Sequence, residues 1–133
     1  MEGTSLGAEF QHEPLPDSTS HIRLLEILRV DSEDRIVCRL TAWPINDAPK
    51  YYALSYTWGE SNSSSLVIIN EGVFAAGANC IYALQQAYAS EASEFFWVDA
   101  LCIDQKSTQE KNHQVAMMGQ IYARAVHVFA CVG

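Results

Sequence analysis

Apolar side chains dominate two runs near the start of the chain, over residues 22–30 and 36–43, and the polar stretch 31–34 separates them. A short polar link between two apolar runs is typical of a β-hairpin. We therefore expect an antiparallel strand pair over these residues. Residues 1–20 are rich in Gly, Ser, Thr, Pro and acidic side chains instead, and we expect them to form a flexible lead-in.

From residue 51 onwards, short apolar runs alternate with segments in which apolar residues recur at helical spacing. Strands are predicted over 51–58, 66–70, 95–103 and 126–132, and the run 95–103 is apolar apart from Asp99, as in a central strand covered on both faces. Helices are predicted between these runs and are described next. This alternation predicts an α/β unit with a parallel sheet. The last strand runs to the end of the chain, so we expect the unit to be incomplete on its C-terminal side.

Two helices carry recognisable start signals. The first covers residues 79–89, with Asn79 as its expected N-cap. In the second, Ser107 and Glu110 have the spacing of a capping box, in which each side chain accepts a hydrogen bond from the other residue's backbone N–H. Its buried stripe is expected to run from Val115 to residue 125. Gly119 lies inside this helix and favours close packing against the sheet.

Length and composition narrow the class of protein. The chain has 133 residues, of which 49% are apolar, and this is enough for one domain with a continuous core. Eight Lys and Arg stand against sixteen Asp and Glu, without a basic cluster, so nucleic-acid binding is not expected. The four cysteines are dispersed and fit buried thiols in a reducing compartment. There is no secretory signal and no membrane-length apolar run, and we expect a cytoplasmic protein.

Polar side chains gather where predicted parallel strands end, and in open α/β sheets ligands bind at that edge. The first group follows the strand that begins at residue 51, and the second lies at the end of the strand 95–103. The structural alternatives are that the aromatic side chains belong to the core and that the carboxylates cap a loop or a helix. The candidate crevice residues are Ser55, Tyr56, Trp58, Gly59, Glu60, Asp99, Cys102, Asp104 and Gln105.

Catalytic candidates are few. Glu110 and Asp99 are weak candidates for an acid or base, because the capping box already gives Glu110 a structural role. Cys102 with His113 as its base would form a thiol nucleophile, but a buried inert cysteine is the stronger interpretation. The sequence contains no metal-ligand cluster, phosphate loop or nucleophile elbow. From the residues alone, the inference ends at a small α/β domain.

Two longer segments resemble the motifs of a known family. Residues 52–59 (YALSYTWG) resemble the first motif of the fungal heterokaryon incompatibility (HET) domain, and residues 97–105 (WVDALCIDQ), with Glu110 and Gln114 after them, resemble the second. The resemblance implies one HET domain over 21–133 with a TIR-like or flavodoxin-like fold. It implies a signalling module in fungal regulated cell death, which acts with other HET or sensor proteins or as a homo-oligomer through its sheet edge.

HET domains resemble TIR domains, several of which cleave NAD. This implies NAD as a candidate substrate, with no prosthetic group. In HET proteins the glutamate that best matches the NAD-cleaving one of TIR domains lies in a Trp-rich segment downstream of the strand 126–132. The chain stops before it, and we expect the chain to lack catalytic competence. The alternatives are an NAD glycohydrolase that uses a carboxylate within these residues, and a non-catalytic adaptor that pairs with full-length HET proteins.

Overall fold

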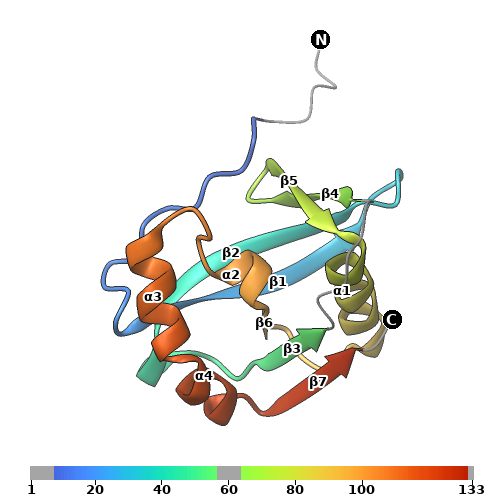
Figure 1. Ribbon diagram of the computed structural model, residues 1–133. Helices are drawn as coiled ribbons and strands as arrows, with labels where there is room; N and C mark the ends of the chain where they lie inside the picture. Colours follow the sequence, from blue (N-terminus) through green and yellow to red (C-terminus); the bar gives the residue numbers. More distant parts are fainter. Residues whose placement is uncertain (1–7, 57–63, 132–133) are drawn as a thin grey trace.

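The fold is a mixed α/β domain in which a seven-stranded sheet is flanked by helices (Figure 1). The computed structural model describes residues 8–56 and 64–131. Across the sheet the strand order is β5-β4-β2-β1-β6-β3-β7. The strands are β1 (His21–Val30), β2 (Ile36–Pro44), β3 (Tyr52–Tyr56), β4 (Ser64–Ile69), β5 (Gly72–Gly77), β6 (Phe96–Trp97) and β7 (His127–Cys131). The helices are α1 (Ala78–Ser90), α2 (Asp99–Cys102), α3 (Thr108–Ala116) and α4 (Met118–Arg124), with a 3₁₀ turn at Ile45–Asp47.

The predicted hairpin is confirmed, but it lies in the middle of the sheet rather than ahead of it. Strands β1 and β2 pair antiparallel along their whole length. Their turn is fixed by the carboxylate of Asp31, which accepts hydrogen bonds from the backbone N–H groups of Glu33 and Arg35. Ile22 and Leu24 of β1 are fully buried. Because both edges of the hairpin carry further strands, it forms the centre of the sheet.

The predicted parallel sheet is confirmed only in part. Strand β3 pairs parallel with β6 on one side and with β7 on the other. Beyond the hairpin, β4 pairs parallel with β2 and antiparallel with β5, so the sheet as a whole is mixed. Strand β5 was not predicted. Its Gly and Ala residues have low strand propensity, and its turn uses Asn70 and Glu71, both with positive φ, in place of a glycine.

The predicted central strand over 95–103 is wrong beyond Trp97. Residues Asp99–Cys102 form the helical turn α2, in which the N–H of Cys102 bonds to the Val98 carbonyl at 2.8 Å. Leu101 and Ile103 are nevertheless as buried as the strand itself. An apolar run that is buried on all sides does not distinguish a strand from a helix, and this explains the error.

The second predicted helix is divided in two at Met117, whose N–H bonds to the carbonyls of both His113 and Gln114. The predicted burial of Val115 in α3 is wrong, because 50% of its surface is exposed. The close packing predicted at Gly119 is also wrong, since an added Cβ there would meet nothing within 4 Å. In the first helix, the N-cap residue is Gly77 rather than Asn79.

Residues 8–13, named here the strap, lie along the free edge of β5. The N–H of Phe10 donates to the carbonyl of Val73, and the N–H of Val73 donates to that of Ala8. Gly72 permits this approach, because a Cβ at that position would lie 2.9 Å from the Cα of Phe10. The sequence predicted a flexible lead-in over 1–20. Ala8, Phe10 and Ser20 form backbone hydrogen bonds with Val73 and Ile45, and composition does not reveal such contacts.

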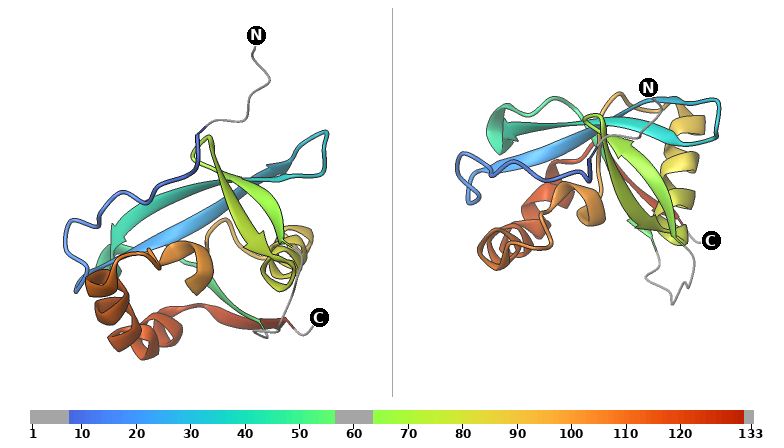
Figure 2. Two further views of the ribbon diagram at one scale, coloured as in Figure 1. Left: turned by 45° about the horizontal axis from the view of Figure 1, so that its top comes forward. Right: turned by 90° about the horizontal axis from the view of Figure 1, so that it is seen from above.

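The helices gather at two separate places around the sheet. In both views of Figure 2, α1 lies well apart from the group formed by α2, α3 and α4, and strands of the sheet run between them. The α4 end is fastened to the segment before β3 by a 2.6 Å hydrogen bond from the Tyr51 hydroxyl to the Ile121 carbonyl. None of the helices in residues 8–56 and 64–131 has the length and apolar content that a membrane span requires.

Candidate functional site

The predicted crevice edge holds Ser55 and Asp99. Ala53 of β3 pairs in parallel register with Trp97 of β6, and Ser55 and Asp99 each follow two residues later. These two residues therefore reach the same edge of the sheet. Tyr56 ends β3 at this edge, where its backbone pairs with Cys131. The other candidates of the first motif, Trp58, Gly59 and Glu60, lie outside the described residues.

Asp99 has the more favourable surroundings for acid–base chemistry of the two carboxylate candidates. Burial raises the pKa of its carboxyl, and hydrogen bonds from backbone N–H groups, that of Ala100 first, oppose this rise only in part. Burial also raises the pKa of the Tyr122 hydroxyl, and the negative charge of Asp99 adds to the effect. A carboxyl whose pKa is raised keeps its proton to a higher pH, so it is available as a general acid more often than a fully solvated one.

Cys102 has the properties of a core thiol. It is completely buried, and its Sγ accepts a hydrogen bond from the Val98 N–H at 3.4 Å. Burial raises the pKa of the thiol to about 12, so the nucleophilic thiolate is scarce at neutral pH. His113, the base considered for it, pairs with the Ser18 hydroxyl instead. The inert-cysteine interpretation is the one that these surroundings favour.

Glu110 forms a buried ion pair with Arg23 of β1. The side chains of Glu110 and Arg23 are 7% and 4% exposed, and the guanidinium donates two hydrogen bonds to the carboxylate, at 2.6 and 2.8 Å. Burial on its own would raise the pKa of Glu110, but the hydrogen bonds from Arg23 and from the backbone N–H of Asp104 outweigh it and lower that pKa. Such a carboxylate is a poor acid or base, because it is held ionised by fixed donors.

The capping box predicted for α3 is therefore only half present. The Ser107 hydroxyl accepts the N–H of Glu110, as predicted. The Glu110 carboxylate does not return to Ser107, whose N–H donates to the carbonyl of Asp104. Instead, Glu110 reaches Arg23, which also donates to the carbonyls of Cys102 and Glu13. The ion pair thus joins β1, α3, the end of α2 and the strap.

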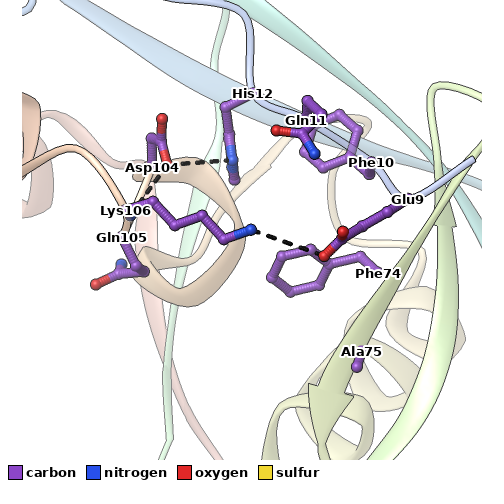
Figure 3. A pocket seen from close by; sticks show the side chains of 9 residues that line it. All are labelled: Glu9, Phe10, Gln11, His12, Phe74, Ala75, Asp104, Gln105 and Lys106. Carbon is purple, nitrogen blue, oxygen red and sulfur yellow. Dashed lines mark hydrogen bonds and ion pairs between the residues drawn. The ribbon is translucent and has the colours of Figure 1, made fainter.

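Asp104 and Gln105 line a pocket of about 270 Å³ beneath the strap (Figure 3). The Nε2 of Gln105 donates to the carbonyl of Asp99 at 3.0 Å, which places this pocket next to the crevice edge. We call it the strap pocket. Its lining residues are Glu9, Phe10, Gln11, His12, Phe74, Ala75, Asp104, Gln105 and Lys106.

His12 is the most buried titratable group of the strap pocket, with 7% of its side chain exposed. Its Nε2 lies 2.8 Å from the Leu101 carbonyl, and because a carbonyl can only accept, this nitrogen carries the hydrogen. Burial lowers the pKa of His12, so the ring is predominantly neutral at pH 7 and its Nδ1 is an acceptor. This Nδ1 faces the Asp104 carboxylate at 3.8 Å.

Arg23 and His12 were not among the predicted site residues. Arg23 carried a usable signal, since it is a cation next to the fully buried Ile22 and Leu24, and a buried Arg requires an acidic partner. His12 carried none, because it lies in a segment whose composition is typical of a flexible tail. Within the described residues, no group of three His, Cys, Asp or Glu side chains could hold a metal ion.

Comparisons with known proteins found one family model and one related protein that match this chain. Residues 51–133 match the family model described as heterokaryon incompatibility protein (HET). The chain is 31% identical over 134 residues to heterokaryon incompatibility protein 6, OR allele, of Neurospora crassa. The match covers 90% of this chain and 20% of that protein, so the chain spans about a fifth of its relative. No solved structure matches this chain.

Proposed function

The chain belongs to the heterokaryon incompatibility family, and from this premise we propose that it is a signalling module of the reaction that kills fused fungal cells of unlike genotype. The observation that carries the proposal is the family match over 51–133. We further propose that the described residues act without catalysis. The ion pair supports this, since Arg23 keeps Glu110 ionised and buried.

Induced expression in a filamentous fungus tests the signalling role. Hyphae that accumulate the folded chain are expected to arrest and to take up a membrane-impermeant dye. A matched pair of variants links the effect to the folded domain: Leu24→Asp places a charge at a fully buried position and should abolish killing, whereas Leu28→Asp, at a position that is 41% exposed, should retain it. Normal growth of hyphae that contain the folded wild-type chain would contradict the proposal.

NAD cleavage is the second candidate, and the surroundings of Asp99 are the observation in its favour. Under this alternative, β6, β3 and β7 form the nucleotide-binding part of a TIR-like or flavodoxin-like sheet, and Asp99 with Ser55 lines its crevice. The assay is nicotinamide release from NAD by the purified chain. We expect none. Turnover that is lost in Asp99→Asn, with the circular dichroism spectrum retained, would establish the alternative and overturn the non-catalytic proposal.

The sheet edge formed by β7 supports a proposal about partners. Within the described residues β7 pairs only with β3, and Val126 and Val128 beside that edge are 55% and 39% exposed. An unpaired edge strand offers backbone donors and acceptors to a further strand. We propose that this edge joins a second copy or another HET protein. If the chain self-associates through this edge, Val128→Lys should reduce the mass measured by light scattering. Val30→Lys, on the β1–β2 hairpin, is the control and should leave that mass unchanged.

A further inference from the structure

We propose that the strap pocket binds the guanidinium or amidinium group of a ligand. The pocket lies between the strap, β5 and the loop 104–106, and it is separate from the Arg23–Glu110 pair that lies deeper in the domain. The inference does not depend on the signalling role. It rests on three properties of the pocket: its charge, its pair of acceptors and its aromatic wall.

The charge of the pocket favours a cation. Glu9 and Asp104 contribute two carboxylates, Lys106 contributes one ammonium group, and His12 is neutral at pH 7. A bound cation would balance the remaining negative charge, whereas an anion would add to it. This distinguishes the pocket from the phosphate-binding sites that are common in α/β proteins, which present backbone N–H groups and basic side chains.

Two hydrogen-bond acceptors lie next to each other without a donor shared between them. The Nδ1 of His12 is an acceptor, because the ring's hydrogen is on Nε2, where the Leu101 carbonyl holds it. The nearest carboxylate oxygen of Asp104 lies 3.8 Å away, beyond hydrogen-bond distance. A guanidinium or amidinium group presents N–H groups as a planar fork and could donate to both acceptors at once.

One wall of the pocket consists of three rings. Phe10, His12 and Phe74 lie edge to face, with centroids 4.8 to 6.3 Å apart. A planar cation is weakly hydrated and binds well against such a wall. The volume of about 270 Å³ is slightly below the range of about 300–1,000 Å³ that is usual for drug-sized ligands, so a head group with a short apolar stem fits best.

Lys106 occupies the mouth of the pocket and would move when a ligand enters. Figure 3 shows its side chain extending across the pocket towards Glu9 of the strap, where the Nζ to Oε2 distance is 3.7 Å. Both side chains are mostly exposed, at 74% and 68%, and such ion pairs are weak. A ligand cation could therefore take the place of the Lys106 ammonium beside Glu9 at little cost.

The test is a titration of the isotopically labelled chain, followed by amide chemical shifts. The probes are methylguanidinium, N-acetylarginine amide and a short arginine-containing peptide, with acetate as the anionic control. Saturable shifts are expected with the cations and not with acetate. Asp104→Asn should weaken binding about tenfold, because it removes the charge from one acceptor. Asp47→Asn makes the same change at an exposed position outside the pocket and should leave binding unchanged.

A second pair of variants tests the contribution of the strap. Gly72→Ala would force the strap away from β5 and should abolish binding, although it leaves Asp104 intact. Gly77→Ala, in the same strand, meets nothing within 4 Å and serves as the matched control. A circular dichroism spectrum like that of the wild type would establish that each variant is folded. The proposal would be overturned if the wild type did not bind the cationic probes. It would also be overturned if Asp104→Asn and Gly72→Ala bound them as tightly as the wild type does.

The three cationic probes distinguish the two sources of such a group. Equal affinity for methylguanidinium and for the peptide would indicate a free small cation, and affinity for the peptide that is at least tenfold higher would indicate an arginine side chain. Either result agrees with the chemistry proposed. Binding should also weaken as the pH falls below 6.5, because a proton on the Nδ1 of His12 removes one acceptor.

Discussion

Arg23 and Glu110 connect four segments of the chain through one buried contact. Arg23 bonds to Glu110 and to two backbone carbonyls, and Glu110 also accepts the N–H of Asp104. The charges are thus almost fully satisfied by fixed partners. Removing one partner of such a pair leaves the other buried and uncompensated, which costs much more than the net contribution of the pair.

Glu110→Gln is therefore expected to lower the free energy of unfolding by about 3–5 kcal/mol, since it leaves the Arg23 charge without its counter-ion. Urea denaturation measures this change. Arg39→Met, which removes a pair with Glu26 in which Arg39 is 55% exposed, should cost far less. Similar losses in the two variants would mean that the Arg23–Glu110 pair is not structurally important.

His12 predicts how stability depends on pH. Burial lowers its pKa in the folded state below the ordinary value of 6.5, so the unfolded chain binds more protons between those two pKa values. The contribution of His12 to the free energy of unfolding is therefore fully present above pH 6.5. It is lost as the pH falls from 6.5 through the lower pKa of the folded state. Urea denaturation at pH 7.5, 6.5 and 5.5 should show this decline in the wild type and a smaller one in His12→Gln. The same substitution at exposed His127 should leave the decline unchanged.

At the scale of elements, α3 and α4 show how a local feature redirects a helix. Where α3 ends and α4 begins, the N–H of Met117 bonds to the carbonyls of both His113 and Gln114. Val115 before this point faces solvent, whereas Ile121 after it lies in the core. A uniform helical pattern assumes one straight axis, and a bend between two helices breaks that assumption. The bend also leaves Gly119 on an open face of α4.

Gly119→Ala should stabilise the domain by about 0.5–1 kcal/mol, because alanine has the higher helix propensity and its Cβ meets no other group. Thermal unfolding followed by circular dichroism measures the effect as a rise in Tm. Gly72→Ala provides the contrast within the same chain. A fall in Tm for Gly119→Ala would show that α4 packs more closely than described.

Sequence patterns predicted the elements better than their places in the sheet. The hairpin β1–β2, the helix α1 and the serine cap of α3 follow from local rules of periodicity and capping, and they were predicted. The pairing of β4 with β2, the insertion of β6 beside β1, and the Arg23–Glu110 contact depend on residues that are 31 to 87 positions apart. No local pattern encodes such distances, so this part of the fold and of the site was not predicted.

At the scale of the whole molecule, the two edges of the sheet differ in whether another segment covers them. The strap covers the edge of β5 with backbone hydrogen bonds to Val73, whereas β7 has no such cover within the described residues. The covered edge is thereby protected from pairing with other chains. The contact also holds Glu9 and His12 at the strap pocket. The strap therefore covers one edge of the sheet and lines the proposed binding site.

Displacing the strap should make it accessible to proteases. In Gly72→Ala the added Cβ would lie 2.9 Å from the Cα of Phe10, and the backbone of the strap must move to relieve that contact. Limited proteolysis with mass spectrometry should show cleavage between residues 8 and 20 at least several-fold faster than in the wild type. Gly77→Ala should behave like the wild type. Equal rates in all three proteins would show that the strap contact does not depend on Gly72.

The position of β6 between β1 and β3 has a consequence for how the protein is made. The hairpin can form soon after residue 44 is available, but β3 joins it only through β6, which is just Phe96–Trp97. At about 5–20 residues per second, a ribosome needs roughly 2 to 9 seconds to proceed from β3 to β6. During that interval the apolar β3 has no neighbour from the hairpin side, and such an unpaired strand makes a nascent chain prone to aggregation.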